Sequence, residues 1–210
     1  MIDKTIDDTD CLLVIDVQND FCSGGALAVP DGDAVVPVIN AFIPSFSNVV
    51  FTQDWHPAAH SSFASEHENQ NPLDIIQMPY GEQTLWPDHC IQGSHGAEFH
   101  ADLNQVAAKM VVRKGFRQSI DSYSAFFEND KTTATGLIGY LNERGVRRVF
   151  CVGLATDFCV RFSAEDAHRA GFKTTVLSAA CRGIDIEGSE AAAYADMTDM
   201  GITILDSTSL

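Results

Sequence analysis

Residues 153–160 (GLATDFCV) place a cysteine where an apolar strand turns into a helix. Thr156 or Asp157 can cap that helix. Cys159 then lies in its first turn, where unpaired N–H groups and the helix dipole stabilise a thiolate. The same N–H groups can bind the oxyanion that forms when sulfur attacks a carbonyl carbon. The segment suits a catalytic cysteine, although a small buried core residue explains it equally well when it is taken alone.

Two charged residues near the ends of other strands could assist such a nucleophile. Asp16 lies near the end of the apolar run 12–17 (LLVIDV). Burying a carboxylate there costs free energy unless it is paired with a cation or serves in catalysis. Lys114 lies near the end of the run 110–116 (MVVRKGF). Placed together, the lysine would hold Asp16 and Cys159 as anions, and Asp16 could act as the base. For Lys114 alone, a solvated strand-end lysine is the simpler alternative.

A third group of side chains has the chemistry of a metal site. Asp54 and His56 are two residues apart at the end of the strand-like run 49–55, so they point the same way and can bind one ion. His60 and His89 follow in a histidine-rich segment. Three protein ligands leave coordination positions open, as in catalytic sites. A carboxylate with imidazoles suits zinc, iron or manganese without selecting among them. For each histidine alone, a solvated loop residue is the alternative.

The remaining cysteines and histidines have simpler explanations. The six cysteines have no regular spacing and include no CxxC pair, which argues against disulfides and against a cysteine-rich zinc site. Buried and unreactive thiols are expected in the apolar strand runs, at Cys11, Cys151 and Cys181. The other histidines are expected to be solvated, namely His67, His95, His100 and His168.

The elements that must position these residues alternate between strands and helices. Strands are predicted at residues 12–17, 49–55, 110–116, 148–154, 173–179 and 202–205. Helices are predicted at residues 34–46, 132–144, 156–169 and 189–200. The alternation predicts an α/β fold of three αβα layers around a central, mainly parallel sheet. Ligands of such sheets bind at the carboxyl ends of the strands, where the polar residues above are found.

Length and composition narrow the class of protein. The 210 residues suit a single domain spanning 1–210, with metal and substrate bound in an aperiodic loop region at about 56–105. The formal net charge of −16 would repel a phosphate backbone, so nucleic acid is not an expected partner. No apolar run reaches the length of a membrane span, and the polar N-terminus does not resemble a signal peptide. A cytoplasmic location without membrane contact is expected, and a homo-oligomer is left open.

Five segments together form a family pattern. They are DVQNDF (16–21), TQDWHP (52–57), WPDHC (86–90), RKG (113–115) and GLATDFCV (153–160), which extend over nearly the whole chain. In this order and spacing they resemble the nicotinamidases among the isochorismatase-like cysteine hydrolases. The resemblance implies an isochorismatase-like fold and an amidohydrolase that converts nicotinamide to nicotinate and ammonia. It also implies pyrazinamide as a further substrate.

Matching positions imply roles for single residues. Asp16, Lys114 and Cys159 match the family's catalytic triad. The N–H groups of Ala155 and Cys159 match its oxyanion hole, with a non-proline cis peptide expected between Leu154 and Ala155. In the implied reaction Asp16 takes the thiol proton, Cys159 attacks the carboxamide carbon, and Asp16 gives the proton to departing ammonia. Water then hydrolyses the thioester.

The resemblance also implies a metal site and a substrate pocket. Asp54, His56 and His89 match the ligands of one divalent ion (zinc, iron or manganese) that binds the ring nitrogen and orders water. Some relatives use a histidine of this loop as an extra ligand, which leaves the role of His60 open. Phe158 matches a position that varies within the family. The partner is nicotinamide or a similar small aromatic amide, and the residues implied to bind it are Phe21, Trp86, Tyr123, Leu154 and Ala155.

Two alternatives stay open at this point. Another small-amide cysteine hydrolase, acting on N-carbamoyl or ureido acids, would share the triad but would have no use for the metal residues. A catalytically silent metal-binding protein on the same fold would leave Asp16, Lys114 and Cys159 unexplained together. Iodoacetamide labelling separates the second alternative from an enzyme, because a silent protein should have no unusually reactive thiol.

Overall fold

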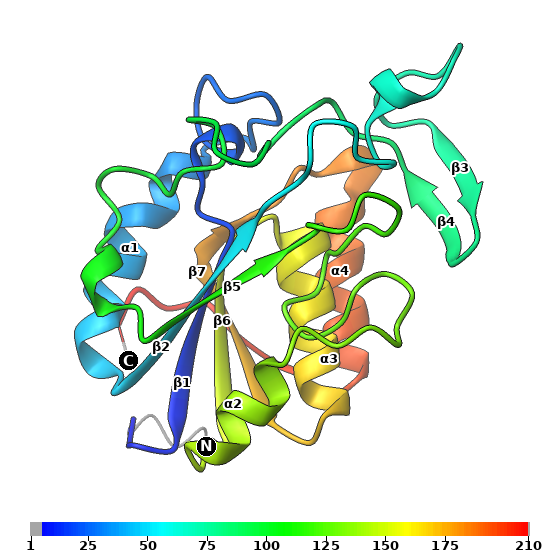
Figure 1. The fold of residues 1–210 in the computed structure, drawn as a ribbon. Coiled ribbons are helices and arrows are strands. Elements are labelled where there is room, and N and C mark those ends of the chain that lie inside the picture. The colour runs from blue at the N-terminus through cyan, green and yellow to red at the C-terminus, as the bar shows by residue number, and fades with distance from the viewer. Residues whose placement is uncertain (1–5, 210) are drawn as a thin grey trace.

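A computed structural model describes residues 6–209, which surround a central sheet (Figure 1). Within these residues the sheet has six strands in the order β5-β2-β1-β6-β7-β8, and all of its pairings are parallel. The strands are β1 (Asp10–Ile15), β2 (Asn48–Asp54), β5 (Met110–Lys114), β6 (Arg148–Leu154), β7 (Lys173–Arg182) and β8 (Thr203–Leu205). The α/β class is confirmed.

Helices cover both faces of this sheet (Figure 1). They are α1 (Val35–Phe42), α2 (Leu137–Glu143), α3 (Arg161–Arg169) and α4 (Ser189–Asp199). The buried strand β1 divides its side chains between two cores. Leu12 and Val14 pack with the residues of α1, whereas Leu13 and Ile15 pack with those of α2, α3 and α4. Three αβα layers result, as the sequence predicts. In the described part of the chain, no helix combines the length and the apolar character that a membrane span requires.

Two helices are shorter than the sequence predicts. The segment 132–144 is helical only from Leu137, because the hydroxyl of Thr135 donates a hydrogen bond to the carbonyl of Ala125 and Gly136 has a φ of 96°. The segment 34–46 keeps an α-helix over Val35–Phe42 and then tightens into a 3₁₀ turn at Ile43–Ser45. In both segments, local hydrogen bonding or a turn residue outweighs the apolar periodicity.

The long segment 57–105 contains regular structure that the sequence analysis missed. Strands β3 (Ile75–Met78) and β4 (Gly81–Thr84) pair antiparallel as a hairpin. The hairpin projects from the body of the molecule (Figure 1). Most of its residues are partly or fully exposed, and they mix apolar with polar types. This composition gives no clear alternation from which the two strands could be predicted.

The order of the strands gathers the predicted site residues. β5, β2, β1 and β6 are consecutive neighbours in the sheet. Their carboxyl ends carry Lys114, Asp54, Asp16 and the turn that leads to Cys159. The chain reverses its direction of progress through the sheet between β1 and β6, and ligands of parallel sheets bind at such a switch point.

Candidate active site

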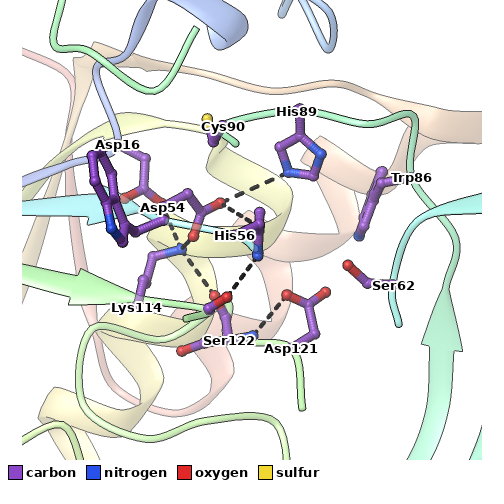
Figure 2. Close-up of polar contacts among 12 residues, drawn as sticks. Asp16, Asp54, His56, Ser62, Trp86, His89, Cys90, Lys114, Asp121 and Ser122 are labelled. Atoms are coloured by element: carbon purple, nitrogen blue, oxygen red, sulfur yellow. Dashed lines mark hydrogen bonds and ion pairs between the residues drawn. The ribbon is translucent and has the colours of Figure 1, made fainter. Parts of the chain in front are cut away.

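The ammonium group of Lys114 contacts the charged or reactive groups around it (Figure 2). Its Nζ lies 2.8 Å from Asp16 Oδ2 and 3.4 Å from Cys159 Sγ. The same nitrogen donates hydrogen bonds to Asp54 Oδ1 and, at 2.9 Å, to the carbonyl oxygen of Ser122. All of these side chains are buried. Lys114 is therefore a paired internal cation, not the solvated strand-end lysine of the simpler alternative.

Asp16 follows β1 with a φ of 49°, a left-handed conformation that non-glycine residues rarely adopt. Its Oδ1 accepts a hydrogen bond of 2.6 Å from the hydroxyl of Thr52, and its own N–H donates to that hydroxyl. Burial raises the pKa of Asp16 to about 6, although the charge of Lys114 acts in the opposite direction. A carboxylate with such a pKa is a stronger proton acceptor near neutral pH than an exposed aspartate.

The turn that holds Cys159 differs from the predicted start of an α-helix. Residues Thr156–Val160 form one π-helical turn that leads directly into α3, and the expected cis peptide between Leu154 and Ala155 is present. The predicted capping by Thr156 or Asp157 is wrong, since no side chain of the described residues caps this turn. Instead, the carboxylate of Asp157 accepts hydrogen bonds from backbone N–H groups at residues 184 and 185, which ties the loop after β7 to the turn.

The pKa of Cys159 shifts in the direction opposite to the one expected for a cysteine at a helix start beside a lysine. Burial raises the pKa of its thiol well above the usual range, and the positive charge of Lys114 only partly opposes this. Burial therefore disfavours the thiolate, and removal of the thiol proton needs a base. Asp16 is available, because a carboxylate oxygen of Asp16 and the sulfur of Cys159 lie within 4.8 Å of each other.

Asp54, His56 and His89 converge beside this pair (Figure 2). Oδ2 of Asp54 lies 3.6 Å from His56 Nε2 and 3.9 Å from His89 Nε2. Backbone carbonyls fix the other ring nitrogens, since His56 Nδ1 lies 2.9 Å from the oxygen of Gly115 and His89 Nδ1 lies 2.8 Å from that of Pro87. Each Nδ1 is thus the donor, and each Nε2 is left to bind a cation.

The charges of this group fit a divalent ion. Burial lowers the pKa of His89 to about 4, so its ring is neutral at pH 7. Burial acts the same way on His56, but the carboxylate of Asp54 outweighs it and raises the pKa of that ring. The buried carboxylate therefore favours a positive charge between the rings. One carboxylate and two imidazoles, all within 4.8 Å of one another, form a donor set for zinc or a similar ion.

Local sequence explains how these ligands are held. Gly115 has a φ of 65°, and a Cβ there would lie 2.4 Å from Cε1 of His56, so only glycine fits after Lys114. The side chain of Gln18 both donates to the carbonyl of Asp54 and accepts from its N–H. The N–H of His56 donates to the carbonyl oxygen of residue 90, which brings His89 to the site.

His60 lies beside His56, with 4.4 Å between their ring centroids. Both of its ring nitrogens have protein partners. Nδ1 lies 2.7 Å from the hydroxyl of Ser62, and Nε2 lies 3.2 Å from the carbonyl oxygen of Ile120. His60 would have to give up one of these contacts to join the ligands, and its role stays open.

A cavity reaches Cys159 from the surface. Its lining is mostly apolar and aromatic, with carboxylates and an imidazole at its polar side: Phe21, Leu27, Asp54, Trp86, His89, Asp121, Tyr123, Ala155, Phe158, Cys159 and Ile184. Four residues expected at the substrate are among them, whereas the side chain of Leu154 packs in the core with the residues of α1. No sequence pattern marks Leu27, Asp121 and Ile184, which lie in segments without periodicity.

Aromatic rings enclose one side of this cavity. Phe158 packs edge to face against Trp86 with 4.8 Å between ring centroids, and against Tyr123 with 5.6 Å. The hydroxyl of Tyr123 accepts hydrogen bonds from Trp86 Nε1 at 3.2 Å and from the side-chain amide of Gln83 at 2.9 Å. Phe21 also lines the cavity and packs edge to face against the imidazole of His89, with 5.5 Å between centroids. The cavity thus suits a flat aromatic ligand.

Comparison with known proteins gives one consistent family. The isochorismatase domain matches residues 10–209 of the chain. A nicotinamidase from Acinetobacter baylyi is 49% identical over 199 residues, which cover 95% of this chain and 93% of that protein. A solved structure described as an Acinetobacter baumanii nicotinamidase and pyrazinamidase is 53% identical with a TM-score of 0.94, over 95% of this chain and 96% of that one.

Two further solved structures contain ligands. A protein from L. infantum in complex with nicotinate is 40% identical with a TM-score of 0.84, over 96% of this chain and 94% of that one. A pyrazinamidase of Pyrococcus horikoshii in complex with zinc is 36% identical with a TM-score of 0.77, over 94% of this chain and 98% of that one.

Proposed function

This chain belongs to the isochorismatase family and has the activity of a nicotinamidase and pyrazinamidase, and we propose that Cys159, Asp16 and Lys114 carry out its chemistry. The reaction is the hydrolysis of nicotinamide to nicotinate and ammonia. One observation carries the assignment of the residues. The buried Nζ of Lys114 contacts both Asp16 and Cys159, at 2.8 and 3.4 Å. A buried acid, cation and thiol in mutual contact are the parts of an activated nucleophile.

The first half of the reaction forms a thioester. Asp16 takes the proton of the Cys159 thiol, and the sulfur attacks the carboxamide carbon. The N–H groups of Ala155 and Cys159 receive the negative charge of the former carbonyl oxygen. Protonated Asp16 then gives its proton to the amide nitrogen, the C–N bond breaks and ammonia leaves. Lys114 keeps its charge and orients both partners throughout.

The second half regenerates the enzyme. A water molecule loses a proton to Asp16 and attacks the thioester carbon, again with the oxygen held by the two N–H groups. The C–S bond breaks, the sulfur recovers its proton from Asp16, and the product leaves as nicotinic acid, which gives its remaining proton to solvent to become nicotinate. Burial of Asp16 supports both roles, because a pKa of about 6 lets this group accept and return a proton near neutral pH.

We also propose that Asp54, His56 and His89 hold one divalent ion, with zinc, iron and manganese as candidates. When bound, such an ion offers open coordination positions for the ring nitrogen of the substrate and for water. The donor set described above supports this proposal, as does the zinc complex of the Pyrococcus horikoshii relative. Asp54 and His89 line the same cavity as Cys159, so a small aromatic amide could contact both.

A panel of amides tests this function. Nicotinamide and pyrazinamide, which carry ring nitrogens, should release ammonia much faster than benzamide, which has the same shape without a ring nitrogen. Metal-stripped protein should lose this preference and regain it when zinc is restored. Faster release from an N-carbamoyl amino acid would favour the other cysteine hydrolases of the family. No release from any amide would favour the silent protein.

Two broader expectations remain proposals. We propose that the whole chain forms one hydrolase domain, supported by the two cores that share one central sheet. We also propose that it works in the cytoplasm, where reducing conditions keep a thiol such as Cys159 in its active form. All six cysteines are free in the structure, which is consistent with such a compartment.

A further inference from the structure

We propose a second metal site, formed by Cys22, Asp33 and His100 and separate from the active site. One ligand atom from each residue, a sulfur, a carboxylate oxygen and an imidazole nitrogen, lies within 4.8 Å of the other two. These donors come from segments about seventy residues apart in the sequence, which meet because the N–H of His100 donates to the carbonyl of Val17. A mixed sulfur, nitrogen and oxygen set suits zinc or another borderline divalent ion.

The three residues border a surface cavity of about 200 Å³, which is large enough for an ion and coordinating water. Asp20, Asn19 and His95 also line this cavity. Its acidic lining, in a chain whose net charge is −16, attracts cations. The active-site cavity has none of these residues in its lining, so the two sites are distinct.

Atoms of the cluster are available to an ion. Oδ2 of Asp33 accepts hydrogen bonds from the N–H and the hydroxyl of Ser23, which leaves Oδ1 facing His100 Nε2 at 3.4 Å. The sulfur of Cys22 is buried, and within residues 6–209 it has no hydrogen-bond partner. The Ser23 contacts fix the carboxylate in place, as the partners of metal ligands commonly do.

The proton balance of binding follows from these contacts. Burial and the charge of Asp33 raise the pKa of Cys22 to about 12, so the free site holds a thiol and binding releases its proton. Nδ1 of His100 accepts a hydrogen bond from the exposed N–H of Asp102. Binding through Nε2 requires the tautomer with its proton on Nδ1, so the site must give up the Asp102 hydrogen bond when the ion binds. A thiolate and a carboxylate then neutralise the two charges of the ion.

The site would fix a loop of the active site. Cys22 follows Phe21 directly, and the segment from Cys22 to Asp33 contains Leu27. Phe21 and Leu27 both line the active-site cavity. An ion bound at Cys22 and Asp33 ties together the two ends of this segment and joins them to His100. This role is structural and does not depend on the proposed reaction.

Cobalt provides a direct test, because only a thiolate ligand gives Co²⁺ its charge-transfer absorption in the near ultraviolet. The full-length chain, stripped of metal and titrated with Co²⁺, should bind two equivalents, and one of them should produce this band. The proposed active-site ligands contain no sulfur. The band should disappear in Cys22→Ser. It should persist in Cys159→Ala, which removes the other candidate thiol, and in His95→Ala, a matched change in the same cavity.

The proposal would be overturned by wild-type protein without the band, by a band that survives in Cys22→Ser, or by a band that is lost in Cys159→Ala. Circular dichroism should show that Cys22→Ser is folded. If it is not, His100→Gln replaces it, because this partly exposed side chain can change without opening the core. His100→Gln should weaken Co²⁺ binding at the second site at least about tenfold. Unchanged binding there would equally reject the site.

Discussion

Asp54 and Lys114 are joined by a hydrogen bond from Nζ to Oδ1, and this contact links the two halves of the active site. The other oxygen of Asp54 faces His56 and His89. Lys114 also lies 2.8 Å from Asp16. One buried cation is therefore shared between the residue proposed as base and the residue proposed as metal ligand. A change of charge at either Asp16 or Asp54 therefore alters the pKa of the other carboxylate, because both contact Lys114.

Cys159→Ala should lower the rate of ammonia release from nicotinamide at least about a thousandfold, because among residues 6–209 it is the only thiol in the cavity lining. Cys181→Ala is the matched control, since this thiol is also buried but lies in the core away from the cavity. A coupled ammonia assay measures both variants. Substantial activity in Cys159→Ala would remove the proposed thioester.

Lys114→Met should destabilise the protein by about 3–5 kcal/mol, because it leaves two buried carboxylates, Asp16 and Asp54, without their shared cation. The free energy of unfolding is measured by urea titration of metal-stripped protein. Lys109→Met changes an exposed lysine at the start of the same segment and should have little effect. Equal unfolding midpoints for the two variants would contradict the pairing described here.

His89→Ala should lower the zinc content of dialysed protein by one equivalent and weaken binding at this site at least about a hundredfold. A chelator should likewise lower the activity of wild-type protein, and added zinc should restore it. His168→Ala, in α3 and outside every candidate metal cluster of the described residues, serves as the control. Zinc retained at wild-type stoichiometry in His89→Ala would argue against the ligand set.

Tyr123→Phe should raise KM for nicotinamide more than it lowers kcat. The change removes the acceptor of the Trp86 Nε1 hydrogen bond, and a buried donor left unpaired costs about 1–3 kcal/mol. Steady-state kinetics separate the two constants. Tyr140→Phe is the matched control, because the buried hydroxyl of Tyr140 has no hydrogen-bond partner within residues 6–209 and its loss should cost little. An unchanged KM in Tyr123→Phe would show that these contacts do not shape the pocket.

The raised pKa of Glu128 predicts how the free energy of unfolding changes with pH. Burial raises its pKa, and the ion pair with Arg117 only partly offsets this. The folded state therefore holds this proton more tightly than the unfolded state, whose glutamate has a pKa of about 4.3. The stabilisation is complete below that value and is lost as pH rises through the folded pKa. Relative to Glu128→Gln, the wild-type free energy of unfolding should thus decrease from pH 4 to pH 7. An increase would mean that the Arg117 pair dominates.

The sequence was most informative where a strand is buried on both faces. The continuous apolar run at residues 148–154 predicts β6 to its last residue, and the polar residues after such strands identify the site. The strand order then explains why Asp16, Asp54 and Lys114 meet. The type of each residue and its place at a strand end were sufficient, because parallel strands carry their carboxyl ends to one edge.

Other features of the site depend on contacts between distant segments, which a local sequence pattern cannot predict. Asp121 and Ile184 reach the cavity only because loops distant in the sequence pack together. The raised pKa of Cys159 reflects its burial, whereas the sequence shows only its place near a helix start. Likewise, the carboxylate of Asp157 looks like a helix cap in the sequence but is used by the loop at residues 184–185.

The projecting hairpin of β3 and β4 supports residues that line the cavity, so its structure can affect which substrates the protein binds. Gln83 of β4 is fully buried and holds both Asp121 and Tyr123, which line the cavity. An insertion or deletion in the hairpin would displace Gln83 and reshape the pocket from outside. Related enzymes could therefore diverge in the amides they accept through length changes in a peripheral ribbon, while every reacting group stays in place.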